Sequence, residues 1–179
     1  ALFELSDRVF ASGCDGLWVH ARKAWLQGLS PKENRDIPPL DYNIVSTLKA
    51  ANPQRFIGIN GGIKTLEEAL SLLQTRQSVS LDGVMLGRAA YQNPSVLFDV
   101  DQRIYRSQHP AITVEEICRL MMAYTANHLA RGGRVHHVTR HMIGLFQGMA
   151  GARRYRQILS VEASRDGADE RVIEQAFAA

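Results

Sequence analysis

The sequence predicts an α/β fold class: the last strand–helix units of a TIM (β/α)8 barrel, which is incomplete, followed by an all-helical C-terminal domain. Short apolar runs alternate with helical patterns up to residue 100, and only helical patterns follow. Alternation of this kind is typical of a parallel sheet with both faces covered. The chain also begins in mid-element, on a helical pattern that we assign to the fifth helix of the barrel.

The first domain, residues 1–100, is expected to contain three strands, each an apolar run that ends in a polar residue or a glycine. We expect strands at 16–20, 55–60 and 82–87, and helices at 2–11, 41–51, 65–76 and 89–98. Thr65 and Glu68 form a capping-box pattern at the start of the third helix. A small open sheet of three strands is the alternative, but only the barrel explains the abrupt start.

The second domain, residues 101–179, is expected to be helical throughout. A second capping-box pattern, "TVEE", precedes a stripe that we predict to be core, formed by Ile117, Leu120, Met121 and Tyr124. Further helices are expected at 135–147, 152–161 and 169–178, and glycines separate them.

The net charge of +3 conceals a strong asymmetry along the chain. Between Ile117 and Val161 there are seven arginines and no acid, so this segment carries +7 and the rest of the chain −4. A local positive field attracts polyanions such as nucleic acid. A solvated helical face is the alternative, but such faces usually mix the two signs.

Composition argues against several classes of protein. No apolar run approaches the ~18 residues that span a bilayer, and the N-terminus has no basic region typical of a signal peptide. Cys14 and Cys118 lie far apart, without metal-ligand spacing, which indicates a reducing compartment. We therefore expect a cytoplasmic protein with no membrane partner and no metal, and we interpret both cysteines as packing residues.

The ends of the second and third strands carry the residues that point to chemistry. The second strand ends in Asn60, Gly61 and Gly62, and the third in Gly87 and Arg88. In a barrel the carboxyl ends of the strands face the active site, and phosphate often sits after strands seven and eight. Glycine lets the backbone approach an anion, and arginine adds a bidentate cation. Either end alone fits a simple turn, but the two together indicate a phosphate-bearing ligand.

His20 ends the first strand, on the same predicted edge. Its imidazole can hydrogen-bond a heteroaromatic ring or a phosphate, although a structural histidine is the alternative. No G-x-G-x-x-G follows a strand, which disfavours a dinucleotide site of the Rossmann type.

Four blocks of the sequence resemble the A subfamily of the tRNA-dihydrouridine synthases, and the similarity extends through essentially all 179 residues. These blocks are "HARKAWLQGLSPKENRDIPPLDY", "INGGIKTLEEA", "DGVMLGRAAYQNP" and "TRHMIGLFQGMAGARRYRQIL". The resemblance implies an FMN-binding TIM barrel with a helical tRNA-binding domain. It also implies reduction of uridines 20 and 20a in the tRNA D-loop, with hydride passing from FMN to uracil C6 and NADPH as the reductant.

The resemblance also assigns roles to individual residues. The cofactor-binding residues it implies are His20 at the flavin, Asn60, Gly61, Gly62 and Gly87 in the FMN loops, and Arg88 at the phosphate. The tRNA-binding residues it implies are Lys32 and Arg35 in "SPKENR" and Arg153 and Arg156 in "GARRYR". Arg22 and Lys23 are expected along the same RNA groove. No protein partner is expected.

One departure limits the expected activity. In the family the catalytic cysteine and an active-site lysine lie in the N-terminal half, which is absent here, so we predict no catalytic residue in this chain. We therefore expect a fragment that is inactive alone. A tRNA-binding fragment without chemistry is the alternative, and a different FMN- or phosphate-binding barrel enzyme is the third hypothesis.

Overall fold

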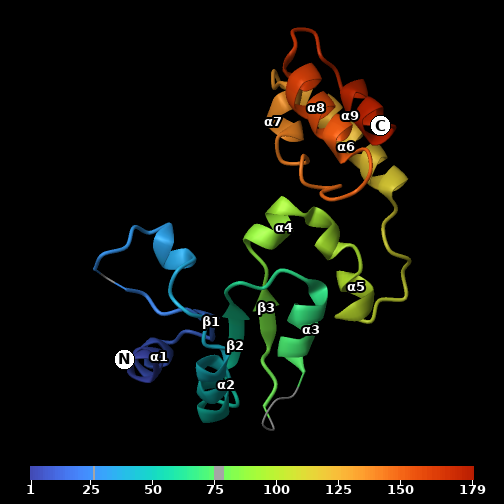
Figure 1. Ribbon diagram of the computed structural model, residues 1–179. Helices are drawn as coiled ribbons and strands as arrows, with labels where there is room; N and C mark the ends of the chain where they lie inside the picture. The colour runs from blue at the N-terminus through green and yellow to red at the C-terminus, as the bar shows by residue number, and fades with distance from the viewer. Residues whose placement is uncertain (26, 75–78) are drawn as a thin grey trace. The chain divides into compact units, whose positions relative to one another are not determined.

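The computed structural model describes residues 1–25, 27–74 and 79–179, and it divides into two compact units (Figure 1). Unit 1 is Ala1–Gly87 and unit 2 is Arg88–Ala179. This division falls ahead of the boundary that we expect from the sequence at residues 100 and 101, which remains a proposal about functional domains. No helix in the described part of the chain is long and apolar enough to span a membrane.

Unit 1 is built on a parallel sheet of three strands in the order β1-β2-β3. The strands are β1 (Gly16–His20), β2 (Phe56–Asn60) and β3 (Gly83–Met85). The register pairs His20 with Asn60 and Asn60 with Met85, so the carboxyl ends of all three strands meet at one edge. The expected strands are confirmed, although β3 is shorter than predicted.

Three helices accompany these strands: α1 (Leu2–Ala11), α2 (Tyr42–Ala51) and α3 (Leu66–Leu73). Asp41 caps α2 by accepting a bond from the Ile44 N–H at 3.2 Å. The predicted capping box opens α3, since the Glu68 N–H donates to Thr65 Oγ1 at 3.1 Å and the Glu68 carboxylate accepts from the Thr65 N–H. The predicted end of this helix near residue 76 lies outside the described residues.

The two faces of the sheet differ sharply. On one face, Ile57 and Ile59 are fully buried, and α2, which carries the buried Leu48, packs against β2. On the other face, the Trp18 ring lies across Gly58 and Gly83, where no Cβ would fit. Trp18 meets Phe56 edge-on with ring centroids 5.3 Å apart, and 48% of the Trp18 surface stays exposed. This second face therefore has no apolar cover in the described chain.

A buried lysine ties the elements of unit 1 together. Lys49 on α2 donates from Nζ to the carbonyls of Pro53 and Arg55 and pairs with Asp82 at 2.8 Å. The same carboxylate oxygen, Oδ2 of Asp82, also accepts from the Ile57 N–H at 2.7 Å, while Oδ1 accepts from Lys49 Nζ at 3.1 Å. Because every partner is a hydrogen-bonded polar group, the buried charge is compensated, and α2, β2 and the start of β3 are held in register.

Unit 2 contains helices, joined by turns and loops, and no strand among its described residues. Its elements are α4 (Arg88–Gln92), η2 (Pro94–Leu97), α5 (Val100–Arg103), α6 (Val114–Ala130), α7 (Val135–Thr139), α8 (Ala152–Val161), η3 (Glu162–Ser164) and α9 (Arg171–Phe177). Its core surrounds Tyr155, whose ring meets Phe146 and Phe177 edge-on at 4.8 and 5.6 Å between centroids. The phenol donates to the Met142 carbonyl at 3.1 Å, and burial raises the pKa of Tyr155 above its ordinary value.

The helix expected over 135–147 is wrong in its second half. The helix α7 ends at Thr139, and turns fill the chain to residue 151. The His141 and Met142 N–H groups bond three residues back instead of four, which tightens the turns. At Gly144 the Gln92 carbonyl approaches so closely that no side chain would fit. Tertiary packing at a glycine therefore overrides the helical pattern.

Candidate cofactor and RNA-binding sites

The strand edge brings His20 and Asn60 together. They are register partners at the ends of β1 and β2, and the Ala21 N–H donates to the Asn60 carbonyl at 2.8 Å. Side chains alternate along a strand, so both lie on the face that Trp18 occupies. Asn60 Nδ2 lies 3.1 Å from the Met85 sulfur. The imidazole is exposed and the amide half-buried, which leaves both accessible to a ligand.

Gly61 and Gly62 turn the chain at this edge with φ values of +125° and +69°. A Cβ would lie 2.9 Å from a Leu40 methyl at Gly61 and 2.5 Å from the other at Gly62, so glycine is required by packing as well as by conformation. The Tyr42 hydroxyl donates to the Gly61 carbonyl at 2.7 Å. Neither glycine N–H donates to an acceptor among the described residues, which leaves two adjacent donors for an anion.

Gly87 and Arg88 follow β3 after one intervening residue, Leu86. No described atom outside its neighbours lies within 4 Å of a Cβ built at Gly87, so the backbone there is open to close approach. Arg88 begins α4 and is exposed. An open glycine followed by a guanidinium is the chemistry that a phosphate needs.

The loop after β1 is closed at its base by Arg22. An isolated antiparallel bridge joins Arg22 to Leu40, and the Arg22 guanidinium donates to the carbonyls of Asp36, at 3.0 Å, and Pro38. This guanidinium holds the loop together, and its expected place along the RNA groove stays a prediction. Lys23 is exposed and stays a prediction.

Lys32 and Arg35 are presented by the outer part of this loop. Arg35 ends the 3-10 turn η1 (Glu33–Arg35), and Lys32 precedes it with helical φ and ψ. Residues three apart eclipse in such a turn, so the two cations lie on one side. Ser30 donates from N and Oγ to the Glu33 carboxylate at 2.8 and 2.6 Å, which also lowers the pKa of Glu33. These bonds fix the turn that displays the cations.

Arg153 and Arg156 occupy the exposed face of α8. Tyr155, Ile158 and Leu159 are buried, which confirms the predicted inward face of this helix. Arg154 lies between the two exposed arginines but is engaged with Glu162 at 3.2 Å. Within the described chain, Arg153 and Arg156 form no ion pair, so their charges are available to a ligand.

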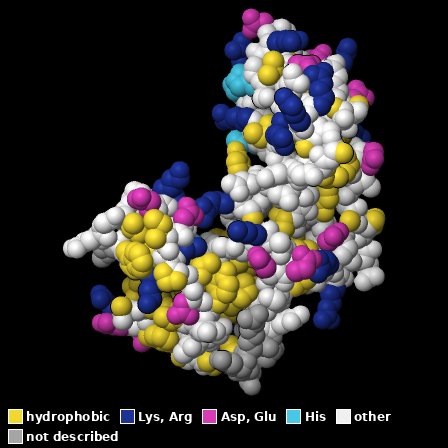
Figure 2. Space-filling model, in the orientation of Figure 1, with side chains coloured by type: hydrophobic (Ala, Val, Ile, Leu, Met, Phe, Trp, Pro, Cys, Tyr) yellow, Lys and Arg dark blue, Asp and Glu magenta, His cyan; other side chains and the backbone are white. Residues whose placement is uncertain are grey.

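The positive field of unit 2 is weaker than its sequence implies. Three of the seven arginines pair with acids that flank the acid-free segment: Arg119 with Glu116 at 2.6 Å, Arg134 with Asp166 at 3.0 Å, and Arg154 with Glu162 at 3.2 Å. Figure 2 shows the resulting mixture of dark-blue and magenta side chains over the helical unit. Four arginines, Arg131, Arg140, Arg153 and Arg156, have no acidic partner among the described residues.

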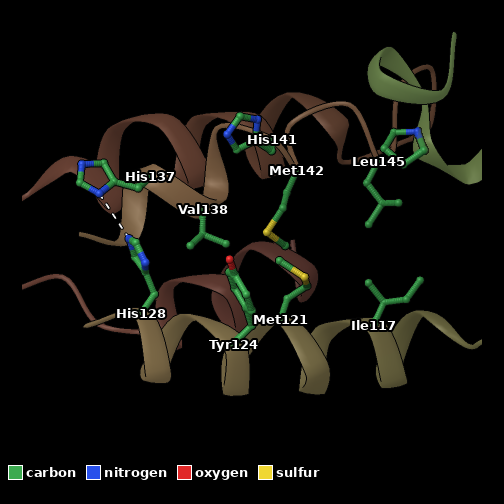
Figure 3. Close-up of a pocket in the computed structure, with 10 residues that line it drawn as sticks. Ile117, Met121, Tyr124, His128, His137, Val138, His141, Met142 and Leu145 are labelled. Carbon is green, nitrogen blue, oxygen red and sulfur yellow. Dashed lines mark hydrogen bonds between the residues drawn. The ribbon is translucent and has the colours of Figure 1, made fainter. Parts of the chain in front are cut away.

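A groove in unit 2 has no counterpart in the sequence-based predictions. It has a volume of about 420 Å³ and is lined by Pro94, Ile117, Met121, Tyr124, His128, His137, Val138, His141, Met142 and Leu145 (Figure 3). The predicted core stripe on α6 is wrong in part, because Leu120 and Tyr124 are 44% and 60% exposed. The available signal was the spacing of three histidines: His128 on α6, His137 on α7 and His141 in the turns that follow α7.

Comparison with known proteins places the whole chain in one group. A family model described as Dihydrouridine synthase (Dus) matches residues 1–179. The tRNA-dihydrouridine(20/20a) synthase of Shewanella oneidensis is 52% identical over 171 residues, which are 96% of this chain and 50% of the relative. The proteins of the same name from Vibrio cholerae and Escherichia coli K12 are 49% and 50% identical, covering 93% and 92% of this chain and 49% and 46% of theirs. The chain thus spans about half the length of the curated relatives it matches.

Proposed function

The chain belongs to the dihydrouridine synthase family, and we propose that it is the C-terminal half of a TIM-barrel enzyme that reduces uridine 20 and 20a in the tRNA D-loop. The observation that carries this proposal is the match over all 179 residues, with identity near one half to tRNA-dihydrouridine(20/20a) synthases. We expect the enzyme to act in the cytoplasm.

The residues at the strand edge fit the FMN that the family uses. We propose that the free N–H groups of Gly61 and Gly62, the open backbone at Gly87 and the Arg88 guanidinium hold its phosphate. His20 and Asn60 then meet the flavin ring by hydrogen bonding. Bound FMN, in its reduced form, would supply the hydride for uracil C6, and NADPH would reduce the flavin again. The fit rests on unused backbone donors and on a glycine with no Cβ to block approach.

The bare face of the sheet supports assignment to an incomplete barrel. Trp18, Phe56 and Met85 are large apolar side chains that keep 48%, 39% and 37% of their surface exposed. Inward-facing residues of a barrel fill its interior, and closure requires the full set of strands. We therefore assign this face to the barrel interior, covered by the strands that the other half of the relatives supplies.

We propose that Lys32 and Arg35 on unit 1, and Arg153 and Arg156 on unit 2, contact tRNA phosphates. Such contacts fix the register of the RNA without reading its bases. They also supply free energy to extrude the target uridine from its stack, which costs a few kcal/mol.

We do not propose any residue of this chain as the proton donor for uracil C5. The Cys14 thiol donates to the Gly16 carbonyl at 3.1 Å, at the amino end of β1 and away from His20. Cys118 lies on α6, and burial raises the pKa of its thiol. We propose that the donor comes from the N-terminal half that the family possesses, which also explains why this chain alone would be inactive.

A gene-deletion experiment tests the proposal. The deletion strain is expected to carry uridine at tRNA positions 20 and 20a, and the complete gene is expected to restore dihydrouridine, as mapped by mass spectrometry. When the gene is shortened to encode only this chain, its product is expected to bind tRNA without restoring the modification. If the complete gene also leaves both uridines unreduced, the chain belongs to a tRNA-binding protein without chemistry.

A further inference from the structure

The groove between α6, α7 and the turns after α7 carries chemistry that the proposed reaction does not use. Figure 3 shows Met121, Tyr124 and His128 of α6 facing His137, Val138 and Met142 across the opening. Val138, Met142 and Leu145 are buried and form an apolar floor, and Tyr124 is exposed at the rim. A volume of about 420 Å³ lies in the range of pockets that enclose small organic ligands.

Hydrogen bonds assign an acceptor nitrogen to two of the rim histidines, His137 and His141. Arg140 Nε, which can only donate, lies 3.1 Å from His141 Nε2, so that nitrogen accepts. The proton of His141 is therefore on Nδ1, which lies 2.9 Å from the Tyr91 hydroxyl. The Arg134 N–H donates to His137 Nδ1 at 3.3 Å, and His128 Nε2 lies 3.3 Å from the same atom. His137 thus carries its proton on Nε2, and His128 donates.

The surroundings of His137 also favour its neutral form. The pKa of His137 is lowered by loss of solvent and then by its neighbours His136, His128, Arg140 and Arg134, in that order. Neutral imidazoles attract a phosphate weakly, because they add no charge. Their flat faces, together with the Tyr124 ring and two methionine sulfurs, suit an uncharged aromatic ring.

The charged residues around the groove indicate what kind of ligand it binds. No acid is among the described residues that line the groove, and all of these except Pro94 come from the stretch Ile117 to Val161, which contains no Asp or Glu. Arg140, which has no acidic partner in the described structure, contacts a rim histidine directly. An uncharged ring flanked by negative charge describes a nucleobase on a phosphate backbone. Proteins recognise unpaired RNA bases by stacking them on tyrosine and histidine rings.

We propose that this groove binds one unstacked nucleobase of the bound tRNA, separate from the uridine that is reduced. The proposal rests on tRNA as the partner in the proposed function. The base stacks on the Tyr124 ring above the methionines, and its polar edge meets His128 and His137. The groove therefore adds a base contact to a surface whose other proposed contacts are to phosphates.

Binding of tRNA to Tyr124→Ala, Tyr124→Phe and the unaltered chain tests the proposal, with fluorescence anisotropy at several salt concentrations. Loss of one stacked base lowers affinity by about 5- to 150-fold. We expect this reduction in Tyr124→Ala, full affinity in Tyr124→Phe, and the same salt slope in all three because no phosphate contact is removed. Tyr124 is 60% exposed, so thermal melting of Tyr124→Ala is expected to match that of the unaltered chain.

A photocrosslinking amino acid at position 124 provides the second readout. We expect ultraviolet light to join it to one nucleotide of tRNA, whereas the same amino acid at Tyr105, which is 74% exposed, should give no defined product. Unchanged affinity in Tyr124→Ala, a reduced salt slope, or crosslinks spread over many nucleotides would overturn the base pocket while leaving the proposed function intact. If the unaltered chain binds no tRNA, both the proposed function and this inference fail.

Discussion

The arginine pair on α8 gives the sharpest test of the RNA surface. Arg153 and Arg156 are exposed, lie on one face of the helix and have no ion-pair partner in the described residues. The double substitution Arg153→Ala/Arg156→Ala removes two cations without touching the buried Tyr155, Ile158 and Leu159. Alanine also favours the helix. The variant should therefore keep its fold and bind tRNA more weakly.

The expected magnitude follows from counterion release. Each neutralised phosphate contributes about 0.7 to 0.9 to the slope of log affinity against log salt concentration. Removing two phosphate-binding cations therefore reduces the slope by about 1.4 to 1.8. Between about 50 and 200 mM salt, the affinity of the unaltered chain should fall about 7- to 12-fold more than that of the double variant.

Fluorescence anisotropy with labelled tRNA measures this slope, and Arg154→Ala is the matched control. Arg154 lies on the same helix but pairs with Glu162. Its substitution therefore removes one positive charge but no proposed phosphate contact. Its slope should stay within about 0.5 of the unaltered chain. An unchanged slope in the double variant, or an equal reduction in Arg154→Ala, would refute the assignment of Arg153 and Arg156 to the RNA interface.

Three further predictions address the cofactor edge and the two cores. In the complete gene product, Arg88→Ala should weaken FMN retention by about 10- to 150-fold, the worth of a charge-assisted bond, and a fully yellow protein after dialysis would contradict this role. Lys49→Met should lower the free energy of unfolding in urea by about 3 kcal/mol, near the lower end for a broken buried pair because Asp82 is partly exposed, whereas the exposed Lys64→Met should change little. Burial raises the pKa of Tyr155, so its stabilisation is complete below the unfolded pKa of about 10 and is lost as pH rises towards the folded pKa. Tyr155→Phe should flatten that alkaline decline in thermal stability, and an equally steep decline in the variant would assign it to other groups.

Local signals predicted much of unit 1. The ranges 2–11 and 16–20 match α1 and β1 residue for residue. The Thr65–Glu68 capping box forms as its spacing requires, because both bonds lie within one turn of the chain. The glycines after β2 were singled out as a phosphate loop, which stays a prediction, and packing of Leu40 supplies a reason for them that no sequence pattern contains.

Tertiary context decided what the sequence could not. Gly144 allows close approach of the Gln92 carbonyl, which belongs to a segment distant in the sequence, and the helical pattern yields to it. Acidic residues outside the acid-free segment, such as Glu162 and Asp166, pair with arginines inside it. Tyr124 has the helical spacing of a core residue but lines a groove. The spacing of apolar residues along a helix does not show whether another element packs against them.

The most direct test of the central claim is the reduction itself, measured on the purified product of the complete gene with FMN, NADPH and unmodified tRNA. We expect dihydrouridine at positions 20 and 20a, with one NADPH oxidised for each uridine reduced, and no product from the 179-residue chain alone. A folded, FMN-loaded product that binds tRNA but leaves both uridines intact would contradict the account. Dihydrouridine formed by the chain alone would contradict the placement of the proton donor in the other half.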